Sequence, residues 1–233
     1  MFTCKASAGK ASQSISSVAV GSYAGTNGQG EAAVSIGDFA GNFLQKELAV
    51  AIGQNAGFTN QGTGTVAIAR SAGYENQGEA AVAIGRASGF TNQGAQAIAF
   101  GLRAGYDLQG TNAIAIGTDA GNTNQHANSI VINASTSSLN GDANAGLYIA
   151  PVRLSTATTQ MVYYNTSTKE VTYNETAIMF PDGSQQTSAY RVVTAPVTST
   201  STGVVGQVAS DATYMYVCVN TNTWVKSALV GGW

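Results

Sequence analysis

The sequence predicts an all-β protein built mainly from a parallel β-solenoid with 16-residue coils, and three observations carry this prediction. The chain has 233 residues, of which 28 are glycine and only 9% are charged. A typical globular domain has about 7% glycine and about 25% charged residues. Residues 1–150 hold 23 of the glycines and no proline, and they repeat with a strict period of 16. The hydrophobic fraction of 44% is enough for a folded core.

Each repeat contains an apolar–small–apolar triplet followed by glycine, as in Val-Ala-Ile-Gly at 82–85. Alternation with a period of two predicts a short strand with one buried face. Glycine ends the strand because it tolerates positive φ, and the Asn-Gln-Gly triplet at 60–62 predicts a further turn. Glutamine recurs at the thirteenth position, where we expect stacked amides to bond one another and turn backbones. Nine such coils would form a rod about 40 Å long.

A coil of 16 residues encloses little apolar volume, so its rows of Val and Ile need a cover. Bringing the same face of three chains together provides that cover in a closed arrangement. We therefore expect a homotrimer.

The composition changes near residue 150, which places the first domain boundary there. The domains expected are a solenoid at 1–150, a β-rich neck at 151–190 and a small C-terminal β domain at 191–233. Residues 161–164 and 170–173 flank a polar turn and predict a β-hairpin, while residues 146–153 predict a strand that leaves the solenoid.

The recurring Ala-Val-Ala-Ile-Gly-x-x-Ala-Gly motif resembles the head of trimeric autotransporter adhesins, the YadA-like head. The resemblance covers residues 1 to about 150, and the strict 16-residue coil departs from the shorter coil of that family. It implies a left-handed parallel β-roll whose Ala-Ile-Gly strand faces the axis of a homotrimer.

Three later segments resemble parts of viral fibres. The 161–173 hairpin and the Phe-Pro-Asp-Gly-Ser-x-Gln-Thr strand at 180–187 are similar to segments of bacteriophage tail fibres and of fibres of large algal viruses. Residues 202–233 are similar to a small C-terminal domain of fibre-like proteins of marine phages. These resemblances imply an extracellular virion protein that attaches to a host-surface glycan or protein receptor. Other tail or baseplate proteins would be its partners in the virion.

Aromatic residues are the candidate ligand contacts, because they offer large rigid contact area at low entropy cost. The alternative for each is a structural role, in a small core or in a stacked ladder. The candidates are Tyr214, Tyr216, Trp224 and Trp233 in the C-terminal domain, and Phe58, Tyr74, Phe90 and Tyr106 at the tenth position of four successive coils.

Several functions are disfavoured by composition. A net charge of −2 without a basic cluster disfavours nucleic acid, and no apolar run reaches the roughly 20 residues of a membrane span. Cys4 and Cys218 have no metal-ligand spacing, and the single histidine, His126, is more simply a solvated loop residue than a metal ligand. No catalytic motif is present, so we expect no metal site, no cofactor and no enzymatic activity.

Three alternatives remain open from the sequence. The chain could be a structural fibre spacer without a receptor site, or a fragment of a bacterial trimeric autotransporter, although we find no signal peptide, coiled-coil stalk or membrane anchor. The enzyme alternative is a viral depolymerase, which would need a pair of carboxylates in a groove between subunits.

Overall fold

The structure, a computed structural model, describes residues 8–9, 13–141, 144–152, 161–174, 178–179, 185–186 and 193–229. The chain divides into two compact units, Met1–Arg153 and Leu154–Trp233. The described residues contain strands and turns but no helix. Accordingly, none of them forms a helix long and apolar enough to cross a membrane.

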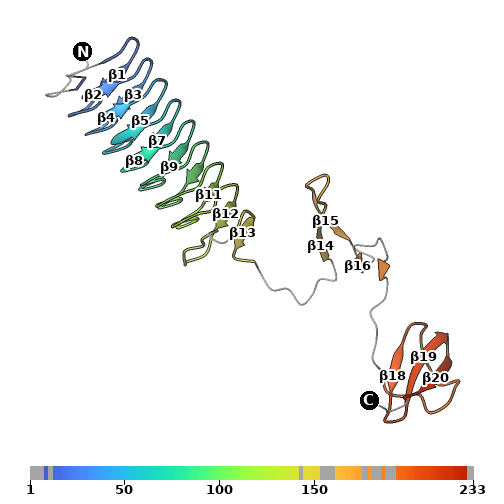
Figure 1. The fold of residues 1–233 in the computed structure, drawn as a ribbon. Coiled ribbons are helices and arrows are strands. Elements are labelled where there is room, and N and C mark those ends of the chain that lie inside the picture. The colour runs from blue at the N-terminus through green and yellow to red at the C-terminus, as the bar shows by residue number, and fades with distance from the viewer. Residues whose placement is uncertain are drawn as a thin grey trace. The chain divides into compact units, whose positions relative to one another are not determined.

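The first unit is a stack of parallel coils around a nine-stranded sheet (Figure 1). Each strand pairs with the next in parallel, and through β12 the register is 16 residues, as in Val66 opposite Val82. The prediction of a β-solenoid with 16-residue coils is therefore confirmed over eight strands, while most of the first expected coil, residues 1–16, lies outside the described residues. The strands are β1 (Val18–Val20), β3 (Val34–Ile36), β5 (Val50–Ile52), β7 (Val66–Ile68), β9 (Val82–Ile84), β10 (Ile98–Phe100), β11 (Ile114–Ile116), β12 (Ile130–Asn133) and β13 (Leu147–Ala150).

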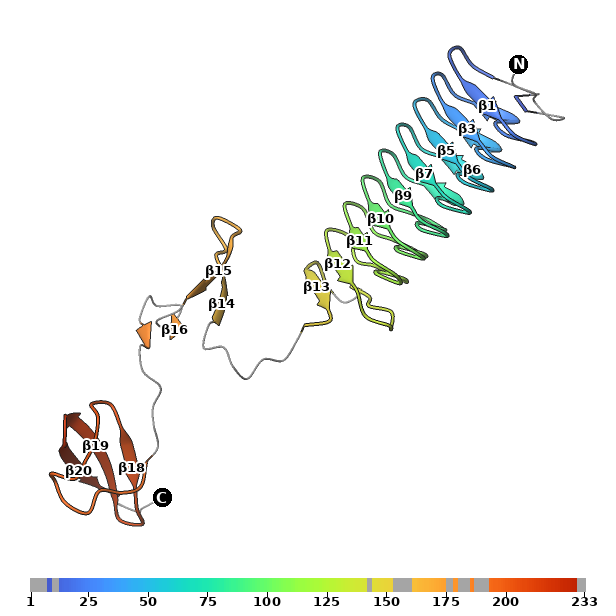
Figure 2. The same ribbon diagram turned by 180° about the vertical axis from the view of Figure 1, so that it is seen from behind.

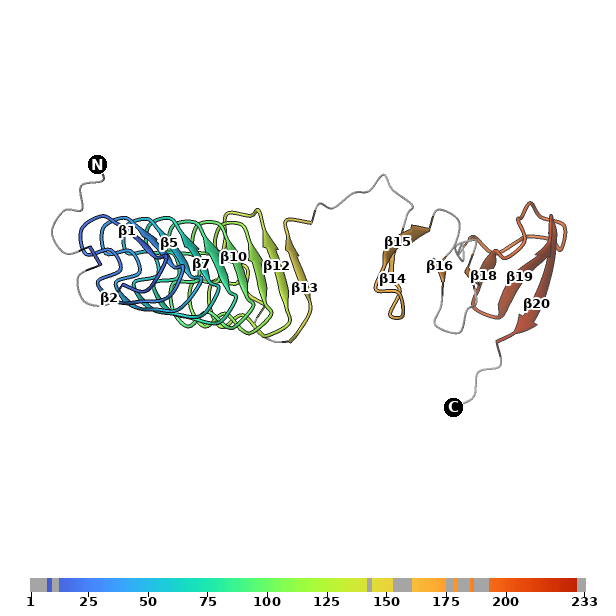
Figure 3. The same cartoon turned by 90° about the horizontal axis from the view of Figure 1, so that it is seen from above.

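A second, four-stranded parallel sheet forms the opposite wall of the coils, as Figure 3 shows from above. Only the first and third residues of each of its strands pair, because the middle residue is left-handed, with φ of 56° at Asn60 and 55° at Asn76. Isolated bridges continue this wall from Glu75 through Thr91 and Asp107 to Thr123. The strands are β2 (Asn27–Gln29), β4 (Phe43–Gln45), β6 (Thr59–Gln61) and β8 (Glu75–Gln77).

The interior of the coils is filled by alanine and glutamine. From β3 to β11 the middle residue of each strand triplet, such as Ala67 or Ala83, is fully buried, and the glutamines at the thirteenth position are at most 2% exposed from Gln29 to Gln125. Gln93 Nε2 donates to the carbonyl of Val82 across the coil (2.9 Å) and to Gln109 Oε1 in the next coil (3.0 Å). The expected hydrogen bonds from the stacked glutamine amides to one another and to the backbone are thus present. They connect the nine-stranded sheet to the opposite wall of the coils.

The branched residues of each triplet point out of the coil instead of into it. Val and Ile at the two outer positions of β1 to β12 are half-buried or exposed, for example Ile36 at 38% and Ile116 at 40%. The middle position of the triplet points into the narrow interior and is alanine in most coils, whereas the branched residues on either side of it point outward. The Val and Ile rows form a continuous apolar strip on the outer surface, here called the outer apolar face.

The segment predicted to leave the solenoid instead extends it, which corrects the expectation for residues 146–153. β13 pairs in parallel with β12, with Ile130 opposite Leu147, so the last coil is one residue longer than the others. Tyr148 packs against the buried cluster around Val131 and donates its hydroxyl to the carbonyl of Asn144 (2.9 Å). A large side chain thus closes the open end of the core at β13, the last strand of the stack (Figure 2).

The described residues of the second unit form three small antiparallel sheets. β14 (Met161–Tyr164) and β15 (Val171–Asn174) form the predicted hairpin, whose turn is closed by bonds from the backbone of Ser167 and Thr168 to Asn165 Oδ1. β16 (Ile178–Met179) pairs with β17 (Gln185–Gln186), while the Pro-Asp-Gly-Ser turn at 181–184 lies outside the described residues.

A three-stranded meander forms the C-terminal sheet. It consists of β18 (Val208–Ser210), β19 (Tyr214–Asn220) and β20 (Thr223–Ala228). Its small core is made by Ala209, Cys218 and Trp224. The division of the chain into solenoid, neck and C-terminal domain stays a prediction, since the contacts divide it into two units.

Candidate ligand-binding sites

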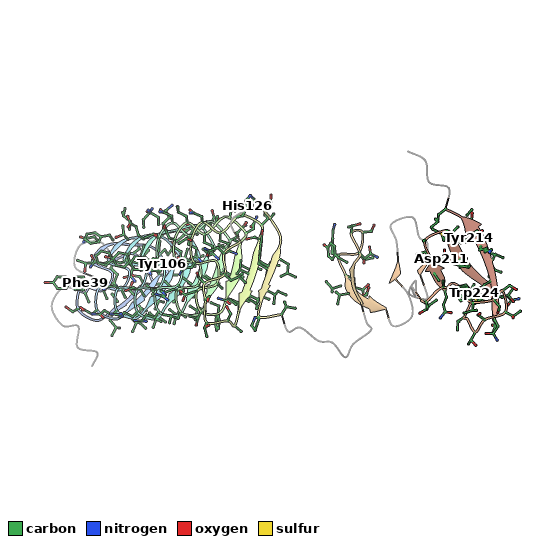
Figure 4. The ribbon with its side chains drawn as sticks, turned by 90° about the horizontal axis from the view of Figure 1, so that it is seen from below. Phe39, Tyr106, His126, Asp211, Tyr214 and Trp224 are labelled. Carbon is green, nitrogen blue, oxygen red and sulfur yellow. The ribbon has the colours of Figure 1, made fainter. Side chains whose placement is uncertain are left out.

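Alternation along β19 and β20 brings three of the predicted aromatic residues to one face of the C-terminal sheet. Tyr216 lies opposite Lys226, and Cys218 lies opposite Trp224, so all four side chains share a face with Tyr214. Figure 4 labels Tyr214, Trp224 and the nearby Asp211 on this sheet. The turn after Asn220 sets the register of β19 and β20, and this register brings the tyrosines, Trp224 and Lys226 onto the same face.

Trp224 is mainly a core residue, with 6% of its surface exposed. Its indole Nε1 donates to the carbonyl of Ser201 (2.9 Å), and its ring lies so close to Gly203 that a Cβ there would be 2.6 Å from Cζ2. The rest of its surface lines a depression of about 250 Å³ together with Tyr216, Lys226 and residues 196–199. This depression combines an aromatic wall with one cationic group, which suits a polar ligand such as a sugar.

Asp211 orders the tyrosines beside the depression. Its carboxylate accepts hydrogen bonds from the Tyr216 hydroxyl (2.6 Å) and from the backbone N–H groups of Thr213 and Tyr214 (2.7 and 2.8 Å). These bonds, that from Tyr216 first, lower the pKa of Asp211, and the same bond raises the pKa of Tyr216. Lys226 Nζ lies 4.1 Å from the centre of the Tyr214 ring, a cation–π contact.

The sequence analysis did not identify Asp211 or Lys226 as site residues. The even spacing of Tyr214 and Tyr216, and of Trp224 and Lys226, on the two strands of a hairpin could have indicated that Lys226 shares a face with the aromatic residues. Trp233, the fourth C-terminal candidate, lies outside the described residues. All four remain predictions as ligand contacts.

The four candidate aromatic residues of the solenoid form a regular stack. The rings of Phe58, Tyr74, Phe90 and Tyr106 are half-buried, their centroids are 4.8 to 5.0 Å apart, and their planes differ by 4° to 7°. Because neighbouring rings cover each other's faces, the stack presents mainly ring edges to solvent. A sugar that stacks on a ring needs a free face, so this ladder offers less to a sugar ring than separate aromatics would.

The ladder is longer than the repeat pattern predicts. Phe39 contacts Phe58 at 6.2 Å and stacks on Tyr23 at 4.8 Å, while Phe43 meets Phe58 edge to face at 5.5 Å. Phe39 and Tyr23 stand at the seventh position of their coils instead of the tenth. The recurrence of aromatic residues at the tenth position therefore did not predict that Phe39 and Tyr23 belong to the ladder.

His126 is exposed on a coil turn, and its Nδ1 lies 2.7 Å from the carbonyl of Ala127 (Figure 4). Nowhere in the described parts of the chain do three or more His, Cys, Asp or Glu residues come together as a metal site would require.

Comparison with known proteins links part of this chain to a phage protein. A segment of 37 residues is 51% identical to a capsule K30/K69-specific depolymerase of Klebsiella phage K64-1. The match covers 16% of this chain and only 5% of that protein's length. No family model matches the chain, and no solved structure matches it. The similarity to this phage protein is therefore confined to a short segment of both chains.

The prediction that the protein is not an enzyme was wrong on this comparison. The similar phage protein is a depolymerase, and depolymerases are enzymes. The absence of known catalytic motifs was a weak argument, because carboxylates from different coils can meet in space without any local sequence signature.

Proposed function

We propose that this chain is part of a bacteriophage tail fibre or tail spike that recognises a polysaccharide on the host surface. The observation that carries the proposal is the 51% identity to a capsule-specific phage depolymerase over 37 residues. The solenoid supports it, since a stack of regular coils is suited to projecting a binding site away from a virion. The resemblance to YadA-like heads and to phage fibre segments agrees with this role.

The outer apolar face supports assembly of the chain as a homotrimer. Each strand of the nine-stranded sheet places two large apolar residues on this face, and several of them are more than a third exposed, among them Ile98, Ile130 and Leu147. Water-soluble monomers rarely expose an apolar strip of this extent. Two further copies of the chain would cover it about a three-fold axis.

The C-terminal depression is the proposed receptor site of this fibre. Tyr216, Trp224 and Lys226 line it, and Tyr214 lies beside it. Presentation of three such sites on one trimer would raise a modest affinity through avidity. Other proteins of the tail or baseplate would hold the fibre on the virion.

Binding to purified K30 and K69 capsular polysaccharides, measured by biolayer interferometry, tests the recognition. We expect Tyr216→Ala to weaken binding about tenfold or more, because Tyr216 lines the depression and loss of a central aromatic contact has this effect. Met215→Ala is the matched control, because Met215 is 45% exposed on the opposite face of the same strand. Equal loss in both variants would contradict a site on the Tyr216 face, and no binding to either capsule or to host cells would contradict the proposal.

Depolymerisation of the same polysaccharide is the second candidate function, favoured by the activity in the relative's name. Glu75 and Asp107 occupy the same position of coils two apart, joined through Thr91. Two coil spacings place them about 9.6 Å apart, close to the range of about 6.5–9.5 Å for inverting glycosidases. The assay measures the release of reducing ends from the polysaccharide. Activity in the wild type and in Glu79→Gln, together with loss of activity in Asp107→Asn and in Glu75→Gln, would establish the function. Undiminished chain length with wild-type protein would exclude it.

A further inference from the structure

Positive charge in the described coils of residues 13–141 is concentrated at one corner. Residues 13–141 contain four cationic and seven acidic side chains, and three of the four cations are Arg70, Arg86 and Arg103. They lie in three successive coils, Arg70 and Arg86 16 residues apart and Arg103 one position further along its coil. With about 4.8 Å between coils, the three guanidinium groups form a short row along the solenoid axis.

The row borders a depression of about 290 Å³. Ser71 and Ala87 lie between the arginines and leave its floor open because their side chains are small. Phe90 and Tyr106, the last two rings of the aromatic ladder, form its side. The edge of an aromatic ring carries partial positive charge, so these ring edges and the arginines all favour a negative ligand.

Two of the three arginines have no ionic partner within the described residues. Arg103 forms an ion pair with Asp119, donating to its Oδ2 at 2.6 Å. Arg70 and Arg86 are exposed and form no ion pair with any described residue. Stacking two unpaired guanidinium groups one coil apart is electrostatically unfavourable. A row of anionic groups at a similar spacing would relieve that repulsion.

We propose that this corner binds a carboxylated polysaccharide whose chain runs along the coils. The guanidinium forks of Arg70 and Arg86 would each take a sugar carboxylate in paired hydrogen bonds, which is the geometry that arginine favours. Arg103, held by Asp119, bounds the site at one end. The inference rests on the proposed recognition of a surface polysaccharide and adds that the polymer is acidic.

An acidic polysaccharide fits the corner better than a nucleic acid does. Proteins that hold single strands stack bases on free aromatic faces, and the ring faces of this ladder are covered by neighbouring rings at 4.8 to 5.0 Å. The chain as a whole also carries a net charge of −2, whereas nucleic-acid binding depends on many cationic contacts.

The test compares polygalacturonate with its fully methyl-esterified, neutral form, using the full-length chain and biolayer interferometry. We expect the Arg70→Gln/Arg86→Gln variant to bind polygalacturonate at least about tenfold more weakly, as loss of charge-assisted bonds predicts. Lys46→Gln is the matched control, since it removes the fourth cation of residues 13–141 and should change binding less than about twofold. Both arginines are exposed, so the thermal unfolding of the double variant should match that of the wild type.

Three results would overturn the inference. They are unchanged binding by a folded Arg70→Gln/Arg86→Gln variant, equal binding of the neutral ester, and equal or tighter binding of single-stranded DNA. Weaker binding by Arg70→Lys/Arg86→Lys than by the wild type would support the paired geometry. Binding of polygalacturonate without any binding of host capsule would support this site while contradicting the proposed function, so the two failures can be told apart.

Discussion

Glycine at the ninth position of the coils is required by space as well as by backbone conformation. At Gly89, φ is +50°, and a Cβ would lie 2.6 Å from Gln93 Oε1 and 3.2 Å from the Ala83 Cβ. The glutamine cannot move aside easily, because it is buried and its amide bonds the Val82 carbonyl. At the fifth position the clash is with backbone: a Cβ on Gly85 would lie 2.4 Å from the Gly101 carbonyl oxygen.

Gly89→Ala should therefore destabilise the protein by about 3 kcal/mol or more, from the left-handed backbone together with the clash. Gly64→Ala is the matched control, because Gly64 has a similar φ of +66° but a Cβ there would have no other atom within 4 Å. It should cost only about 1 kcal/mol. Urea unfolding of both variants measures the difference, and equal costs would show that the glutamine makes way.

Asp211 makes the stability of the C-terminal sheet depend on pH. Its pKa is lowered in the folded state, so its contribution is present above the unfolded value of about 3.9 and is lost as pH falls through the folded value. The pKa of Tyr216 is raised, so its contribution is present below about 10 and is lost at higher pH.

We therefore expect the C-terminal unit to be less stable at pH 3 than at pH 7, and Asp211→Asn to reduce this difference. Both tryptophans of the chain belong to this unit, so tryptophan fluorescence during urea unfolding reports it selectively. An unchanged pH dependence in Asp211→Asn would show that other carboxylates are responsible.

At the scale of the element, the glutamine ladder holds the two sheets of the solenoid together. Gln93, Gln109 and Gln125 each donate to the backbone of the opposite wall at 2.9 Å, and the first two also bond the next glutamine. An interior of alanine alone would give little hydrophobic stabilisation per coil. The amides supply both volume and hydrogen bonds.

Gln93→Glu should destabilise the solenoid by several kcal/mol at pH 7, since it buries a carboxylate among carbonyl groups. Gln93 Oε1 already lacks a hydrogen-bond donor among the described residues. The loss should be smaller near pH 4, where a protonated carboxyl can donate one bond. Asn92→Asp is the matched control, because it adds the same charge to the neighbouring exposed residue. Thermal unfolding at both pH values measures the effect, and equal shifts in both variants would contradict it.

The elements were predictable from the sequence to different degrees. Period-two alternation predicted the strand at 82–84 and the equivalent strands of the other coils. Turn residues between two apolar runs predicted the hairpin around Asn165. A strand at residues 146–153 was also predicted, but its pairing with β12 was not, because that pairing requires a 17-residue step that the strict repeat argues against. The grouping of Tyr216, Trp224 and Lys226 needed the register of β19 and β20, which a bulge near Asn220 adjusts.

At the scale of the whole molecule, the outer apolar face is the feature that most needs a partner. Ile68 and Ile84 lie in adjacent strands on this face and are only half-buried in the single chain. In a homotrimer they would be covered by neighbouring chains, and a charge there would be buried without a partner.

Ile68→Lys/Ile84→Lys should therefore convert a trimer of about 71 kDa, three times 23.7 kDa, into a folded monomer. Light scattering coupled to size exclusion measures the mass, and circular dichroism checks the fold. Leu44→Lys is the matched control, because Leu44 is 62% exposed on the other sheet and should leave the trimer intact. A wild-type protein that elutes as a monomer would refute the trimer.

The solenoid, its 16-residue period and the positions of its strands could be predicted from the sequence, because each coil repeats the same local rules of alternation and turning. Three features required the folded chain: which residues face inward, how the aromatic ladder passes from the seventh to the tenth position of the coil, and that Arg70 and Arg86 border the same depression. A repeat specifies which positions are equivalent. Whether a position faces inward, and what lies beside it, depends on the width of the closed coil and on the approach of distant turns, which no single repeat contains.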